Sequence, residues 1–138
     1  MSDEAQERKS LSLARLKRSR QHLKSAHDLL RNDDYADSIS RSYYAIFQSA
    51  RALLAIDGLD SRKHSGVVSL FNRHFIKAGK LPKHWAVVLK DARRSREMAD
   101  YTEIAEFSRQ DAEGQLADAE AFVQAVESLI SKMNQNKD

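Results

Sequence analysis

The stretch Asp34–Asp57, DYADSISRSYYAIFQSARALLAID, decides the fold of this chain. Its apolar side chains recur every three or four residues, which predicts one long helix with a broad buried face. These positions are Ile39, Tyr43, Ile46, Phe47, Ala50, Leu53 and Leu54. A polar row with the same period lies beside them, formed by Arg41, Tyr44, Gln48 and Arg51. This row either lines a cleft or faces water, and the functional interpretation depends on which.

The composition favours a single all-α domain. Of 138 residues, 41% are hydrophobic and 31% charged, which is ordinary for a globular chain. Strand-rich folds need glycine and proline for frequent turns, yet the chain has only four Gly and one Pro. We therefore expect one domain over residues 1–138, with a core from about 10 to 133. Its expected architecture is an up-and-down helical bundle of four long helices and one short helix.

Apolar spacing predicts four more helices, at about 2–33, 62–78, 83–100 and 108–133. In the first, Arg20 and His27 fall on the same stripe as the apolar residues Leu13, Leu16, Leu23, Ala26 and Leu30. Gly58 is expected to end the central helix, and Ser61 to cap the short one. The tail 134–138 is expected to be loose.

Along the inner stripe of the fourth predicted helix, the side chains become smaller from Trp85 to Ala99. Small residues at that end either let another element approach or leave a cleft. Arg93, Arg96, Glu97 and Asp100 share an adjacent face, where Arg96 and Asp100 are spaced to pair. After it, Ser108 and Asp111 resemble a capping box for the last helix.

Charge is segregated along the chain although the net charge is only +3. Segments 8–31 and 62–96 are rich in Lys and Arg, whereas segment 97–127 is acidic. In one interpretation, basic and acidic helices pack as neighbours. In the other, the basic segments form a surface for a phosphate-bearing partner.

Several chemistries lack a sequence signature. There is no Cys, no glycine-rich phosphate loop, and no pair of His residues at metal-ligand spacing with nearby carboxylates. We therefore expect no metal site and no cofactor. The chain has no apolar run of membrane-spanning length and no signal-peptide core, so we expect no membrane partner and a cytoplasmic location.

The candidate ligand-binding residues combine arginine, tyrosine and histidine. Arginine binds phosphate through parallel N–H donors, and tyrosine stacks or donates a hydrogen bond. We place seven residues around a cleft: Arg41, Tyr44, His64, Arg93, Arg96, Asp100 and Tyr101. The alternative is an ordinary ion-pair network between two helices. His64, on the apolar face of the short helix, is open to both interpretations.

Three segments together resemble the HEPN family (higher eukaryotes and prokaryotes nucleotide-binding domain). They are the central stretch with its RSYYAIF element at 41–47, KHSGVVSLFNRHFIKAGKLP at 63–82, and RRSREMADY at 93–101. The similarity runs from about Leu13 to Ile130 and is greatest to a small prokaryotic branch. It implies a dimerising helical bundle. It also implies a partner nucleotidyltransferase in a toxin–antitoxin system, and metal-independent ribonuclease activity in active members.

One departure bears on catalysis. Active members of the family carry an Arg followed, after four to six residues, by a His. Arg96 aligns best with that Arg, and Tyr101 stands where the His would lie. The reference pKa of tyrosine is about 10, against about 6.5 for histidine, so a tyrosine is a poor general base at neutral pH.

Three hypotheses follow. The first is a homodimeric nucleotide- or RNA-binding protein that partners a nucleotidyltransferase. The second is a metal-independent ribonuclease with a variant catalytic pair, in which Arg96 stabilises phosphoryl charge and Tyr101 or His64 moves protons. The third is a helical interaction module without a ligand.

Overall fold

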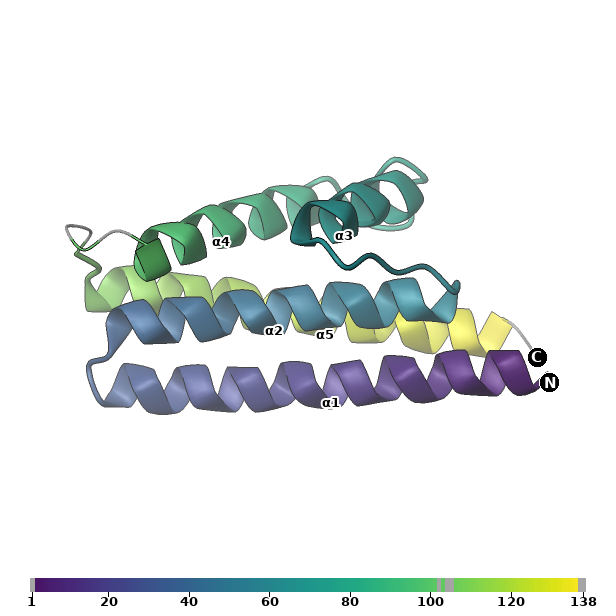
Figure 1. Ribbon diagram of the computed structural model, residues 1–138, viewed down its shortest axis with the longest axis horizontal. Helices are drawn as coiled ribbons and strands as arrows, with labels where there is room; N and C mark the ends of the chain where they lie inside the picture. The colour runs from purple at the N-terminus through teal and green to yellow at the C-terminus, as the bar shows by residue number, and fades with distance from the viewer. Residues whose placement is uncertain (1, 102, 104–105, 137–138) are drawn as a thin grey trace.

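The computed structural model describes residues 2–101, 103 and 106–136, and within these ranges it contains helices and no strand. The elements are α1 (Asp3–Arg31), α2 (Tyr35–Ile56), α3 (His64–Phe71), the π-helical turn η1 (Asn72–Ile76), α4 (His84–Tyr101) and α5 (Arg109–Asn136). Helices α1 and α2 run antiparallel side by side, α5 lies against α2, and α3 and α4 form a layer on the other side of α2 from α1 (Figure 1). The predicted all-α bundle is confirmed.

Helix α2 is the central element of the core. All seven apolar residues predicted for its inner face are buried, and small residues are buried beside them. It packs against α1, α4 and α5, whose own core residues include Leu16, Leu89 and Phe122. The helix that the sequence singles out is therefore the one on which the others are assembled.

The inner face of α1 differs from the predicted one in its N-terminal half. Leu13, predicted to be buried, is 65% exposed, and the small Ser12 faces α2 instead. Serine hydroxyls donate to backbone carbonyls across this interface at 2.7–2.8 Å: Ser12 to Ala52, Ser19 to Ala45, and Ser38 to Ala26. Because serine is small and satisfies its own hydroxyl there, it suits a close interface better than leucine does.

Arg20 and His27, on the apolar stripe of α1, lie at its edge with α5, and Arg20 holds its charged head at the rim. Arg20 donates from Nε to Glu127 at 3.1 Å, and His27 Nε2 lies 2.5 Å from Glu120. These contacts join the basic first helix to the acidic last one. They match the interpretation in which oppositely charged helices pack as neighbours.

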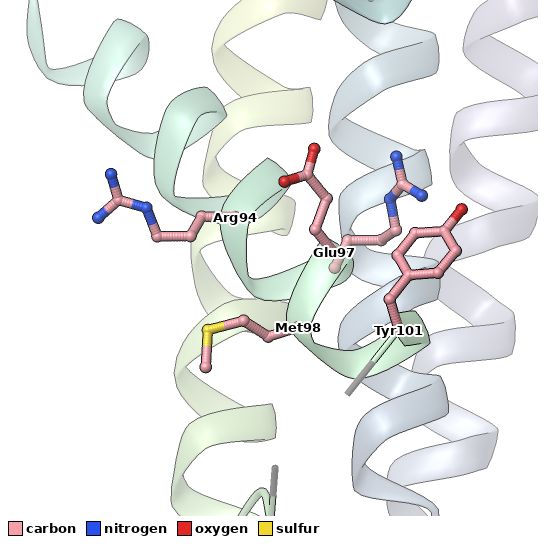
Figure 2. Close-up of a pocket in the computed structure, with 5 residues that line it drawn as sticks. Arg94, Glu97, Met98 and Tyr101 are labelled. Carbon is pink, nitrogen blue, oxygen red and sulfur yellow. The ribbon is translucent and has the colours of Figure 1, made fainter. Parts of the chain in front are cut away.

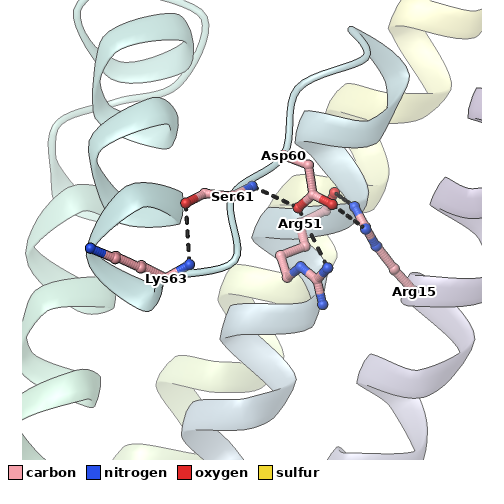
Figure 3. Close-up of polar contacts among 5 residues, drawn as sticks. All are labelled: Arg15, Arg51, Asp60, Ser61 and Lys63. Atoms are coloured by element: carbon pink, nitrogen blue, oxygen red, sulfur yellow. Dashed lines mark hydrogen bonds and ion pairs between the residues drawn. The ribbon is translucent and has the colours of Figure 1, made fainter.

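The connection from α2 to α3 is held by an acidic residue. Gly58 ends α2 as predicted, at φ +71°, and Leu59 N–H donates to the Leu54 carbonyl at 3.0 Å. Asp60 then accepts from Arg15 at 3.0 Å and from the Ser61 N–H at 2.8 Å, with Arg51 alongside (Figure 3).

Some predicted boundaries need correction. Ser61 does not cap α3: its hydroxyl accepts from the Lys63 N–H at 3.2 Å, and the helix begins at His64. The predicted helix 62–78 is instead α3 followed by η1. The capping box at Ser108 and Asp111 is confirmed by two reciprocal bonds of 3.0 and 3.1 Å. The predicted loose tail is wrong for 134–136, which continue α5, and residues 137 and 138 lie outside the described ranges.

Candidate functional site

A buried arginine lies at the centre of the site. Arg96 is only 9% exposed. It follows Ala92 by one turn and therefore lies on the inner face of α4, in the part where the inward side chains are small. Its guanidinium carbon lies 5.2 Å from the ring centre of Tyr43, 5.8 Å from that of Tyr44 and 6.0 Å from that of Tyr101. Two tyrosines of α2 and one of α4 thus surround the cation, an arrangement that stabilises a partly dehydrated guanidinium.

The polar contacts of Arg96 include hydrogen bonds with Tyr43 and Tyr101 as well as an ion pair. The predicted pair with Asp100 is present but long, at 3.5 Å, and Asp100 also accepts from the Ser40 hydroxyl of α2 at 3.0 Å. The Arg96 Nε is buried and has no hydrogen-bond partner among the described residues. The Nε–H is therefore a donor of this guanidinium that is not satisfied by the described residues.

His64 is linked to Arg96 through the ring of Tyr43. The Tyr43 hydroxyl lies 2.8 Å from His64 Nδ1, and the imidazole stacks on Phe47 at 4.1 Å between ring centres. Burial raises the pKa of Tyr43 to about 12, so its hydroxyl keeps its proton and is able to donate to Nδ1. Burial, and then the charges of Arg96 and Arg93, lower the pKa of His64. At neutral pH the imidazole is therefore uncharged, with Nε2 free to carry a proton.

A second histidine borders the site on the α1 side. His22 Nδ1 lies 3.4 Å from Arg41 Nη1, and its ring centre is 5.8 Å from that of Tyr44. Burial and the charge of Arg41 lower the pKa of His22. Beside this pair is a depression of about 350 Å³ that Leu29, Asp37, Ser40, Arg41 and Tyr44 line. Tyr44 thus separates this depression from the Arg96 side.

The C-terminal end of α4 carries an open depression of about 480 Å³, lined by Arg94, Arg96, Glu97, Met98 and Tyr101. Arg94 and Tyr101 project to opposite sides of α4, with Glu97 between them (Figure 2). Tyr101 is 77% exposed, so its hydroxyl is accessible to a ligand or another protein. A smaller depression continues along α4 past Arg94 and Glu97 to Lys90, Arg93 and Val68.

The structure brings most of the predicted residues together and separates one of them. Tyr44, Arg96, Asp100 and Tyr101 form one group, His64 joins it through Tyr43, and Arg93 lies at its edge beside Glu97 at 3.5 Å. Arg41 contacts His22 on the far side of Tyr44, and no direct contact between Arg41 and Arg96 is seen among the described residues.

Sequence reasoning missed four residues of this region: His22, Ser40, Tyr43 and Phe47. Tyr43 and Phe47 were assigned to the core, which is correct, but their contacts with His64 also position the imidazole. One available signal was the phenol of Tyr43 within an otherwise apolar stripe, because a buried tyrosine hydroxyl needs a partner.

The described ranges contain neither a metal site nor a membrane-spanning helix. No group of His, Asp or Glu residues there is arranged to hold a metal ion. Among the described helices, none combines the length and apolar character needed to cross a bilayer.

Comparison with known proteins identifies relatives along almost the whole chain. A family model described as the HEPN domain matches residues 12–129. A UPF0332 protein of Thermotoga maritima is 37% identical over 117 residues, which cover 85% of this chain and 89% of the relative. A protein of Methanocaldococcus jannaschii named "Putative toxin" is 32% identical, covering 82% of this chain and 84% of its own length.

A solved structure shares the fold. The crystal structure of TT1696 from Thermus thermophilus matches with a TM-score of 0.73 at 18% identity, covering 86% of this chain and 97% of that one. At this identity the likeness supports the helical architecture alone.

Proposed function

Because this chain belongs to the HEPN domain family, we propose that it is a nucleotide- or RNA-binding protein of a toxin–antitoxin-type system that acts with a nucleotidyltransferase. The observation that carries the proposal is the Arg96 guanidinium, held among tyrosine rings beside an open depression. Arginine binds phosphate through paired N–H donors, and tyrosine rings stack on bases. The name of the Methanocaldococcus jannaschii relative supports the toxin–antitoxin part.

The expected binding mode follows from the contacts of Arg96. A phosphate oxygen takes the place of Asp100, whose 3.5 Å contact is longer than a typical charge-assisted hydrogen bond. Tyr101 and Tyr44 then flank the attached nucleoside, and their hydroxyls and rings are available to it. Arg41 offers a second cation on the other side of Tyr44.

The test is binding of ATP and of a short single-stranded RNA to the purified protein. We expect the double variant Arg96→Ala/Tyr101→Phe to bind both probes at least about tenfold more weakly. Arg73→Ala removes an exposed arginine of η1 and serves as the control for net charge. Unchanged binding by the double variant contradicts the site assignment. Absence of binding by the intact protein favours a helical interaction module without a ligand.

A second candidate function is a metal-independent ribonuclease, and the observation that favours it is the uncharged imidazole of His64 near Arg96. An imidazole that is neutral at pH 7 can accept a proton, whereas Tyr101 would need a strongly lowered pKa. We expect RNA cleavage that persists in the presence of a chelator and is lost in His64→Asn. Cleavage lost in Tyr101→Phe but kept in His64→Asn would move the proton-transfer role to Tyr101.

Two further parts of the proposal concern assembly and location. We propose a homodimer, as the HEPN resemblance implies, and α4 exposes the apolar side chains of Val87 and Met98. We also propose a cytoplasmic location. Sedimentation equilibrium tests the dimer. Co-purification with a nucleotidyltransferase encoded beside the gene tests the partner. A monomer at all concentrations, or no co-purification, contradicts the respective part.

A further inference from the structure

Three arginines near His64 have incomplete hydrogen bonding. The Nε atoms of Arg51, Arg93 and Arg96 are all buried and lack a partner among the described residues. Each of these guanidinium groups also forms one long ion pair. The distances are 3.4 Å from Arg51 to Asp60, 3.5 Å from Arg93 to Glu97, and 3.5 Å from Arg96 to Asp100. Charge-assisted N–H···O bonds are normally about 2.7–2.9 Å long, so these three contacts leave donors unused.

Some ion pairs elsewhere in the described residues are shorter. Arg15 lies 3.0 Å from Asp60, and Arg31 lies 2.5 Å from Asp28. Arg15 and Arg51 share the Asp60 carboxylate, and Arg15 has the closer contact. The Arg109–Glu113 pair is also long, at 3.7 Å, so length alone does not distinguish the arginines around His64. What distinguishes them among the described residues is a buried Nε without a hydrogen-bond partner. Partly buried donors without partners are costly unless another group, such as a bound anion, satisfies them.

The three arginines converge on one imidazole from two helices. Arg51 of α2 lies over the Phe47 ring at 6.0 Å, and Phe47 stacks on His64. Arg96 of α4 lies over the Tyr43 ring, whose hydroxyl contacts His64. Phe47 and Tyr43 therefore hold the imidazole between the two cations.

Arg93 is the third arginine whose charge acts on His64. It lines the same depression as Val68, which lies one helical turn after His64 in α3. The charges of Arg96, Arg93 and Arg51 all act on His64. Since Nδ1 faces the Tyr43 hydroxyl, the Nε2–H of the neutral imidazole is the donor that remains for a ligand.

We propose that Arg51, Arg93 and Arg96, with His64, bind a phosphate monoester, the end group of a nucleotide or of an RNA strand. A monoester offers three terminal oxygens and carries up to two negative charges near neutral pH, because its second pKa is about 6. A bridging phosphodiester offers two such oxygens and one charge. Three guanidinium groups and an imidazole N–H match the monoester better. The inference rests on the proposed function and names the chemical group that the Arg96 site takes.

The experiment compares binding of AMP and of one short RNA with a 5′-phosphate, a 3′-phosphate or hydroxyls at both ends. We expect a phosphorylated RNA to bind at least about tenfold more tightly than the RNA with hydroxyl ends. AMP is expected to compete with it. We expect Arg51→Gln and Arg93→Gln each to remove most of this preference for a phosphorylated end. AMP competition shows that a free nucleotide fills the site, and preference for one phosphorylated end identifies the RNA terminus.

Two controls keep the result interpretable. Arg73→Gln causes the same loss of charge on the exposed face of η1 and is expected to keep the preference. Arg51→Lys retains the charge but not the fork of donors, and in it Arg15 still holds Asp60, so the loop stays anchored. Equal binding of all three RNAs, or equal weakening of all three by Arg51→Gln, overturns this inference and leaves the proposed function standing. Binding of none of the probes overturns both.

Discussion

At the scale of single residues, Arg96 combines burial with unused hydrogen-bonding capacity. Its charge is stabilised by three tyrosine rings and by the ion pair with Asp100, while its buried Nε has no partner among the described residues. A lysine at this position keeps the charge but loses the planar fork and its stacking on aromatic rings. We predict that Arg96→Lys lowers the free energy of unfolding by about 1–2 kcal/mol and weakens nucleotide binding about tenfold.

Urea unfolding and calorimetric titration measure these two effects. Arg73→Lys, at an exposed position, is the matched control and should change neither quantity. If Arg96→Lys binds nucleotide as tightly as the original protein, paired donation by the guanidinium is not what holds the phosphate.

His64 gives the site a dependence on pH. Its pKa is lowered in the folded protein, first by burial and then by the charges of Arg96, Arg93 and Arg51, with Glu97 opposing. The unfolded chain therefore binds a proton on this imidazole at higher pH than the folded protein does, and the free energy of unfolding falls as pH drops below about 6.5.

We predict that His64→Asn reduces this loss of stability between pH 7.5 and 5.5, because asparagine can keep a contact with Tyr43 but does not titrate. His22 has a pKa shifted in the same direction, so His22→Asn should reduce the loss as well. Urea unfolding at the two pH values measures the effect. The same loss of stability in both variants and in the original protein would show that neither imidazole is its source.

Asp60 is the residue that fixes the entry to α3. Burial alone would raise the pKa of its carboxyl, but the Ser61 N–H and the charges of Arg15 and Arg51 hold it below its usual range. Its stabilising effect is therefore full at neutral pH and is lost only as the pH falls through that lowered pKa.

We predict that Asp60→Asn lowers the free energy of unfolding at pH 7 by about 1–2 kcal/mol, since the nearly buried Arg15 loses its charged partner. The difference should disappear in strongly acidic solution, where the carboxyl of the original protein is protonated as well. Urea unfolding at pH 7 tests the first part.

At the scale of elements, the contact between α1 and α2 depends on small polar residues. We predict that Leu13→Ala changes the free energy of unfolding by no more than about 0.5 kcal/mol, because Leu13 faces solvent. Leu16→Ala should cost about 2–4 kcal/mol, because Leu16 is buried in the core. Thermal and urea unfolding of the two variants measure this difference. A similar loss of unfolding free energy in both variants would show that Leu13 is buried, as the sequence predicted.

The same helix explains what the sequence can and cannot predict. Apolar periodicity located all the long helices, because each buries a stripe that water would otherwise contact. It failed at Leu13 because periodicity counts apolar residues, whereas the interface with α2 selects small ones such as Ser12 and Ser19. Which residues of α1 face α2 depends on the shape of the α2 surface. The sequence of α1 alone does not contain that information.

The site was predictable in part for related reasons. Arg96, Asp100 and Tyr101 lie within a few residues of each other, so their proximity follows from helical spacing. The role of Tyr43 as the link to His64, and the convergence of Arg51 on the same imidazole, depend on how α3 is placed over α2. That placement depends on the Asp60 contacts and on the π-helical turn after α3, neither of which has a sequence pattern that we recognised.

At the scale of the whole molecule, the site lies between α2, whose side chains are mostly buried, and α4, whose C-terminal part is more exposed. Helix α2 is buried along most of its length, whereas the C-terminal part of α4 exposes Met98 and Tyr101. Amide exchange depends on local opening, which costs least where few apolar contacts must break. We therefore expect α2 to exchange slowest and the last turns of α4 to exchange faster.

A phosphate monoester bound at the proposed site would change that order. It would contact Arg51 of α2, His64 of α3, and Arg93 and Arg96 of α4, so opening of the outer layer would require its release. A ligand that binds only the closed arrangement stabilises it by about 2.7 kcal/mol when its concentration is a hundred times its dissociation constant.

We predict that saturating AMP slows amide exchange in α3 and in 93–101 about a hundredfold, with little change along α1. Hydrogen exchange followed by mass spectrometry measures this, and Arg93→Gln is expected to show a smaller effect. Slowed exchange confined to the α1–α2 side near Arg41 and His22 would instead place the phosphate on the other side of Tyr44.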